Sequence, residues 1–591
     1  MSVVSFLFRM TSFASRLLII VLAVAVCTVP LPANAQEEED PQQELPEIAP
    51  QEIEIRGELT LSFPSLQRQP LRGFETPSSI PSVSPDRSPF VEPYKQSLNT
   101  LPDSLPTPDA MSPSAAPSQP SQNGYLEMGA GRYLSRFAEG RLSLPLTSQQ
   151  RLSFEMDYTG TDGFPPYETV DVETPADGLD GRIRFETRHD HVSFAADVHG
   201  RADRYTLYGI PELATNASAV PPDRSGYAGG ARAELRTMGT VTSSVDLFYE
   251  RTQFDTELGL AANAPIASFV ENRLGMDGAA TFRLGSRSAR LEVAALRSSF
   301  GGDPPSQTAY SVDGGGSVGL LESDRLSVRA GARILAFESP VAPQRADSPT
   351  ASATFIVPQG RAELRMDESA TLYAENAPEQ SEGTLADVYE RNPYAQHAPS
   401  VRPQLSTTNA EAGLNLSLGA VRLQTNAGYR YAPSYRYFEN PDPSQSSPRL
   451  FTAAYESARI LHVGGQIGLQ GIRGFATSVR LALRDGALVG DDADIPYFSP
   501  VVGSAMLSYS FANDRGYLQT TGELKSPRPT DPSGTTEIGT YVAFDVEGSY
   551  QLTSSLDAVV RIQNISPAAP KEWARYPRPP AMVMGGVRIR W

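Results

Sequence analysis

The last ten residues, Met582 to Trp591, read MVMGGVRIRW and carry the clearest signal of the fold. Side chains alternate between the two faces of an extended strand. One face of this segment holds Val583, Gly585, Val587, Ile589 and Trp591, and the other holds Met584, Gly586, Arg588 and Arg590. Aliphatic side chains on one face and arginines on the other fit a boundary between an apolar phase and water. The segment therefore predicts a strand of a transmembrane β-barrel.

The same alternation recurs from about Asn123 to the C-terminus, with no sustained helical periodicity. Leu326, Val328 and Ile334, for example, face away from Arg329 and Arg333. The connections between these segments alternate between two kinds. Very short turns are expected near residues 148, 189, 239, 286, 323, 368, 419, 471, 513 and 554, and longer polar, Pro-rich loops separate them.

Short turns at one rim and long loops at the other are typical of outer-membrane barrels. Ten short turns join eleven hairpins, so the pattern predicts an all-β fold, a 22-stranded antiparallel transmembrane β-barrel over residues 123–591. We expect it in the outer membrane of a Gram-negative-type bacterium, in contact with outer-membrane lipid.

The N-terminus has the order of features that is typical of a secretory signal peptide. Arg9 and Arg16 precede an apolar run from Leu17 to Val29, and Ala33-Asn34-Ala35 follows. Residues 1–35 are therefore predicted to be a signal peptide. Residues 36–122 are rich in Pro, Ser and Gln, and this composition predicts a disordered periplasmic linker.

Composition and motifs argue against several classes of function. Removal of Arg9 and Arg16 takes the net charge of −18 to about −20, which disfavours nucleic acid as a partner. The only cysteine, Cys27, lies in the predicted signal peptide. No nucleophile motif, phosphate-binding glycine loop or paired-carboxylate signature occurs, and His189, Asp190 and His191 lack a further ligand for a metal. We therefore expect no enzyme activity, cofactor or metal site.

Two sets of strand residues are expected to have a role in the barrel. Arginines on the inward faces should lie in a wide, hydrated lumen, with neighbouring carboxylates as ion-pair partners. They are Arg182, Arg184, Arg232, Arg329, Arg333, Arg480, Arg484, Arg588 and Arg590. The lipid face of the last strand, with Val587, Ile589 and Trp591, is the expected signal for the barrel assembly machinery.

The C-terminal third resembles the barrel of TonB-dependent receptors. Asn392-Pro393, then Val401-Arg402-Pro403-Gln404 and Glu411-Ala412-Gly413-Leu414, are similar to the family's sequence entering a strand. Val560 to Ile565, Tyr576 to Pro579 and the final aromatic residue also fit. The resemblance implies a 22-stranded barrel that transports a solute, and Glu52-Ile53-Glu54-Ile55-Arg56-Gly57 resembles the segment through which such receptors contact TonB.

The family carries a folded plug domain before the barrel, whereas here only the Pro-rich segment precedes it. Residues 36–122, the long loops or a partner protein must then close the lumen. The leading hypothesis is a TonB-dependent-receptor-like barrel that moves a solute, or assists its movement, with TonB or another periplasmic protein as partner. The alternative is a non-transporting scaffold or assembly accessory of an outer-membrane complex. A passive porin is disfavoured by the strand number and because no inward-folding loop is recognised.

Overall fold

The computed structural model describes residues 123–166, 172–210, 213, 220–261, 263–301, 305–342, 349–440, 450–472, 474–566 and 570–591. The predicted signal peptide (1–35), the predicted linker (36–122) and the candidate TonB-contact segment Glu52 to Gly57 lie outside these residues.

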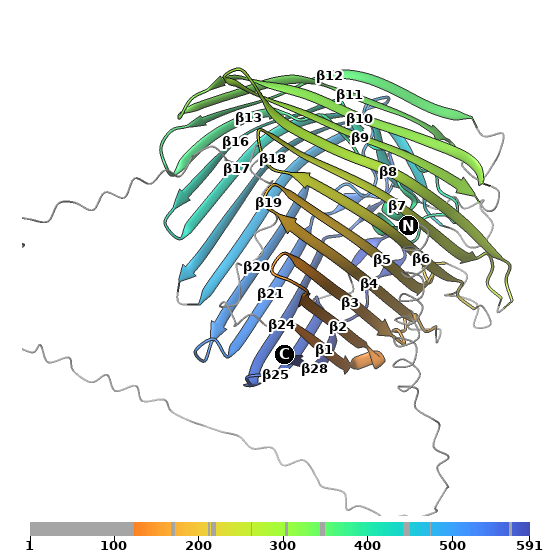
Figure 1. Ribbon diagram of the computed structural model, residues 1–591. Helices are drawn as coiled ribbons and strands as arrows, with labels where there is room; N and C mark the ends of the chain where they lie inside the picture. The colour runs from red at the N-terminus through yellow and green to blue at the C-terminus, as the bar shows by residue number, and fades with distance from the viewer. Residues whose placement is uncertain are drawn as a thin grey trace, which may run out of the picture. The chain divides into compact units, whose positions relative to one another are not determined.

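The described part of the chain forms a barrel wall of 22 antiparallel strands (Figure 1). The wall strands of the first half are β1 (Gly124–Gly131), β2 (Arg136–Pro145), β3 (Gln150–Thr161), β4 (Ala176–His189), β5 (Val192–Thr206), β6 (Asp223–Thr237), β7 (Val241–Glu257), β8 (Ile266–Leu284), β9 (Arg287–Gly301), β10 (Pro305–Glu322) and β11 (Leu326–Pro340). Those of the second half are β12 (Thr350–Arg365), β13 (Ala370–Asn376), β16 (Thr408–Leu418), β17 (Val421–Glu439), β18 (Thr452–Ile472), β19 (Phe475–Leu488), β20 (Val501–Phe511), β21 (Gly516–Lys525), β24 (Tyr541–Thr553), β25 (Leu556–Ile565) and β28 (Met582–Arg590).

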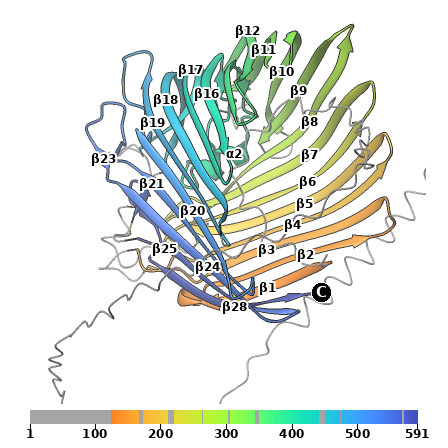
Figure 2. The same cartoon turned by 90° about the vertical axis from the view of Figure 1, so that its left-hand side faces the viewer.

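The wall closes where the last strand meets the first. Each wall strand pairs with the next one along the chain, and β28 pairs with β1 from Tyr125↔Arg590 to Gly131↔Met584. Figure 2 shows the resulting ring of strands. The expected 22-stranded antiparallel barrel is confirmed.

The connections alternate as expected between short turns and long loops. The β4–β5 turn contains only residues 190 and 191, and the β16–β17 turn only 419 and 420. Gly419 has φ +59°, a left-handed conformation that a tight turn needs and that glycine adopts without strain. The tip of the first hairpin, where the short 3₁₀ turn η1 (Arg132–Leu134) joins β1 to β2, is not among the loops expected from the sequence.

The long loops contain the remaining elements. The β13–β16 connection holds β14 (Glu379–Gln380), the helix α2 (Leu385–Arg391) and β15 (Leu405–Ser406). The β21–β24 connection holds β22 (Arg528–Pro529) and β23 (Glu537–Ile538), and the β25–β28 connection holds β26 (Lys571–Trp573) and β27 (Tyr576–Pro577). Short turns face the periplasm in barrels of this kind, so these loops lie at the extracellular mouth.

One face of the wall carries exposed apolar side chains. Val198, Leu274 and Val463, on β5, β8 and β18, are each more than half exposed, as a lipid-facing band requires. Val587 and Ile589 in β28, and Trp591 directly after it, belong to this band. Among the described residues, no helix is both long enough and apolar enough to cross a membrane.

The lipid-facing position of β28 leads to a graded prediction. Val587→Arg should destabilise the folded barrel by about 2–4 kcal/mol, the cost of an arginine near the bilayer midplane. Ile589→Arg should cost less, because Ile589 is closer to the short-turn rim. The free energy of unfolding in lipid vesicles measures both effects, with Val587→Leu as the control. Equal stability of Val587→Arg and Val587→Leu would contradict the assignment.

Candidate functional site

The connection between β13 and β16, residues 377–407, folds back into the mouth of the barrel; we call it the α2 loop. Thr384 caps its helix, because the Thr384 hydroxyl accepts a hydrogen bond from the Asp387 amide at 3.0 Å. Leu385, Val388 and Tyr389 share one helix face and are buried. Figure 2 shows α2 inside the ring of strands. This inward-folding loop was not recognised in the sequence.

The α2 loop contacts strands that are far apart around the ring. On β8, Glu271 accepts a hydrogen bond from the Leu385 amide at 2.7 Å. On β6, Arg224 donates to the Pro393 carbonyl at 2.6 Å, and its guanidinium lies over the Tyr389 ring. On β17, Arg436 lies 2.9 Å from the Asp387 carboxylate. The loop therefore crosses the mouth from one side of the wall to the other.

The wall groups that hold the α2 loop are buried ionisable side chains. Arg224 and Glu271 are 0 % exposed, and Arg436 is 1 % exposed. A buried charge is tolerated only when polar partners surround it, and removing one partner of such a contact is strongly destabilising. These contacts consequently fix the loop in one position.

Aromatic side chains from the α2 loop and from four other connections pack together; we call them the aromatic cap. Its members are Tyr208, Tyr394, Phe451, Tyr497, Trp573 and Tyr576. Tyr208 meets the Tyr576 ring edge-on at 5.1 Å between centroids, and Phe451 meets the Trp573 ring in the same manner at 5.4 Å. Such pairs add to the stabilisation from burial. Of the three expected means of closing the lumen, the long loops are thus seen to pack across the extracellular mouth.

Burial also governs the titratable groups of the α2 loop. It raises the pKa of Tyr394 well above its ordinary value, and the neighbouring Tyr208 hydroxyl adds to the shift. Burial, followed by the Arg224 charge, lowers the pKa of His397. At pH 7 the Tyr394 phenol and the His397 imidazole are therefore both neutral.

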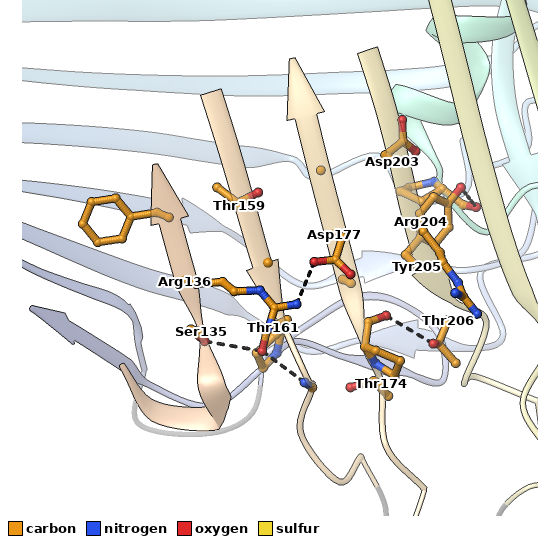
Figure 3. Close-up of a pocket in the computed structure, with 18 of the residues that line it drawn as sticks. Ser135, Arg136, Thr159, Thr161, Thr174, Asp177, Asp203, Arg204, Tyr205 and Thr206 are labelled. Carbon is orange, nitrogen blue, oxygen red and sulfur yellow. Dashed lines mark hydrogen bonds and ion pairs between the residues drawn. The ribbon is translucent and has the colours of Figure 1, made fainter. Parts of the chain in front are cut away.

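A cavity of about 690 Å³ lies between the α2 loop and the wall strands β2 to β7 (Figure 3). Phe137, Tyr205 and Tyr389 give it aromatic surface, and Ser135, Thr159 and Thr252 give it hydroxyl groups. On its charged side, Arg201 lies 3.3 Å from Asp203. Figure 3 shows the Arg136–Asp177 ion pair at 3.0 Å and the Ser135–Thr161 hydrogen bond at its edge.

The nine arginines expected in the lumen lie on β4, β6, β11, β19 and β28. Their positions alternate with the exposed aliphatic residues of the same strands, such as Ile183, Ile334 and Leu481. Arg333 lies 2.5 Å from Asp313, and Arg588 lies 2.6 Å from the buried Glu127. These two contacts belong to an ion-pair network on the inner face. Further members of the network are Arg184 with Glu186, Asp197 and Glu234, and Arg590 with Asp557.

The inner face also contains arginines without a carboxylate contact among the described residues. Arg232 lies over the Phe248 ring, Arg480 donates to the Gln466 side chain, and Arg484 donates to the Ser499 carbonyl. In the described ranges, no group of three or more His, Cys, Asp or Glu side chains is arranged to hold a metal ion.

The sequence matches no protein-family model, and no curated protein is similar to it at a significant level. Solved structures are similar in fold. The FrpB iron transporter from Neisseria meningitidis (F5-1 variant) has a TM-score of 0.62 and 11 % identity, covering 80 % of this chain and 83 % of its own. The copper transporter OprC has a TM-score of 0.58 and 12 % identity, and the match covers 79 % of this chain and 80 % of OprC. The siderophore receptor PirA from Acinetobacter baumannii has a TM-score of 0.59 and 11 % identity, and the match covers 79 % of this chain and 80 % of PirA. The described barrel therefore has the fold of TonB-dependent outer-membrane receptors.

Proposed function

We propose that this protein moves a solute across the outer membrane and binds it in the cavity beneath the α2 loop. The observation that carries the proposal is that residues of the α2 loop both line the cavity and contact the wall. Tyr389 and Pro393 line the cavity and also contact Arg224, which holds the α2 loop to the wall. A solute in the cavity would therefore touch the segment that closes the mouth. The fold supports the same function, since the similar structures are transporters and a receptor.

The cavity also indicates the kind of solute. Its volume of about 690 Å³ lies within the range of roughly 300–1,000 Å³ that is usual for sites of drug-sized ligands. Aromatic rings line it together with hydroxyl groups and the Arg201–Asp203 pair. We infer an amphipathic solute with ring or chain surface and several hydrogen-bonding groups.

Energy coupling is part of the proposal. The candidate TonB-contact segment, Glu52 to Gly57, would bind TonB or another periplasmic protein by adding a strand to its partner. Insertion of the barrel would use the barrel assembly machinery, with Val587, Ile589 and Trp591 as the signal.

A scaffold that does not transport would need no cavity of this size at its mouth.

Filling the cavity tests the proposal. Gly178 on β4 pairs with Thr159 and Asp203, which line the cavity, and a Cβ at Gly178 would meet only the Thr159 hydroxyl, at 3.5 Å. Gly178→Phe should thus fit the fold and occupy the site. Accumulation in the periplasm of compounds that depend on this barrel should fall at least tenfold, as measured by mass spectrometry of cells given a complex nutrient extract.

Gly181→Phe is the matched control. Gly181 lies on the same strand, on the lipid face with Leu179 and Ile183, and a Cβ there would meet nothing closer than 3.8 Å. This variant should accumulate the same compounds as the wild type. If Gly178→Phe folds and transports normally, the cavity is not the solute site. If no compound depends on the barrel at all, the scaffold hypothesis is the better one.

A further inference from the structure

A second, smaller cavity of about 240 Å³ lies on the inner face of β18 to β21 and β24. Arg578, from the connection before β28, also lines it. No residue of the α2 loop lines this cavity. It is smaller than the roughly 300–1,000 Å³ of sites for drug-sized ligands, so a ligand here must be small.

Opposite charges stand on the two sides of this cavity. Ser504 on β20 pairs with Arg480 on β19 and with Glu523 on β21. The backbones of Arg480 and Glu523 are therefore two strand spacings apart, roughly 10 Å. Arg480 donates to the Gln466 side chain at 2.9 and 3.2 Å, and neither Arg480 nor Glu523 has an ion-pair partner among the described residues. Asp545 places a second carboxylate next to Thr521.

A buried hydroxyl at the same cavity lacks a partner. Tyr541 is 0 % exposed, and its hydroxyl makes no hydrogen bond within the described ranges. The Lys525 ammonium and the Arg578 guanidinium both lie over its ring, at 5.2 and 5.0 Å from the centroid. Glu572 fixes both cations, at 2.5 Å from Lys525 and 2.7 Å from Arg578. The ring is therefore held in place while its hydroxyl has no hydrogen-bond partner, and an unsatisfied buried polar group of this kind calls for a partner.

We propose that this cavity is a second binding site, for a small zwitterion that carries one carboxylate and one ammonium group. Arg480 receives the carboxylate in a charge-assisted contact, and Glu523 with Asp545 receives the ammonium group. The Ser504 hydroxyl lies between the two ends, and Tyr541 lies on β24 with Asp545, on the side of the ammonium group. The site goes beyond the proposed function, because it lies apart from the cavity beneath the α2 loop and requires none of its residues.

Binding of L-serine to the purified full-length barrel in detergent tests the proposal, measured by saturation-transfer NMR. Serinamide lacks the carboxylate and N-acetyl-L-serine lacks the ammonium group, so both should bind at least tenfold more weakly than L-serine. Arg480→Gln should remove the discrimination against serinamide, and Glu523→Gln the discrimination against N-acetyl-L-serine. Tyr541→Phe should weaken L-serine binding a few-fold without changing either ratio.

Arg182→Gln, the same substitution on the inner face of β4, is the matched control and should bind L-serine like the wild type. Heat-dependent migration in gels shows that each variant forms a folded barrel. Equal binding of the three probes would overturn the proposal. So would unchanged discrimination in both Arg480→Gln and Glu523→Gln, or absence of L-serine binding in the wild type.

Discussion

The double variant Arg224→Ala/Glu271→Ala should make the outer membrane permeable to large antibiotics. The two side chains hold opposite ends of the helical segment, at Pro393 and at Leu385. Leaving a buried backbone donor or acceptor without its hydrogen-bond partner typically costs about 1–3 kcal/mol. Here the Pro393 carbonyl and the Leu385 amide would lose their partners together, and the α2 loop should leave the mouth. We expect a fall of at least tenfold in the concentration of antibiotic that inhibits growth.

The matched control is Arg232→Ala/Asp277→Ala, which removes an arginine and a carboxylate from the inner faces of the same strands, β6 and β8. Arg232 lies over the Phe248 ring rather than on the α2 loop. The control should keep the barrel closed. If Arg224→Ala/Glu271→Ala forms a folded barrel that stays closed, the α2 loop is not the barrier, and residues 36–122 or a partner protein must close the lumen.

The barrel was predictable because each of its signals is local. Alternation along β28 assigns Val587 to lipid and Arg588 to the lumen without knowledge of any neighbour, and a two-residue turn such as 419–420 sets the pairing of the two strands beside it. The first hairpin shows the limit of this reasoning. Its tip, Arg132 to Leu134, is too short and too little polar to resemble the other extracellular loops, so the strand count could be inferred only from the turns.

The site was predictable only in part, because alternation gives the face of a residue but not its height in the barrel or what lies across the lumen. Arg224 and Arg232 fall on the same face of β6, yet Arg224 is fully buried against the α2 loop. The loop itself is rich in proline and polar residues, which is typical of an exposed connection. The one usable signal was the spacing of Leu385, Val388 and Tyr389, one helix face within an otherwise polar loop.

The other large effect is expected in the candidate TonB-contact segment, Glu52 to Gly57, which lies outside the described residues. If this segment adds a strand to its partner, its backbone amides must donate hydrogen bonds. Ile55→Pro removes one of these donors and fixes φ, so uptake of every compound that depends on the barrel should stop. Ile55→Val keeps the backbone donor and a β-branched side chain, and uptake should be close to that of the wild type.

Combining Ile55→Pro with Arg224→Ala/Glu271→Ala separates the role of the segment in energy coupling from the role of the α2 loop in closing the mouth. Ile55→Pro alone should stop uptake without a leak, because the α2 loop still closes the mouth. In the Arg224→Ala/Glu271→Ala background the leak to large antibiotics should persist with Ile55→Pro, since diffusion through an open mouth needs no energy. If Ile55→Pro instead causes a leak by itself, the segment acts as part of a plug rather than as a contact for TonB. If Ile55→Pro changes neither uptake nor permeability, the hypothesis that this segment couples transport to an energy source is wrong.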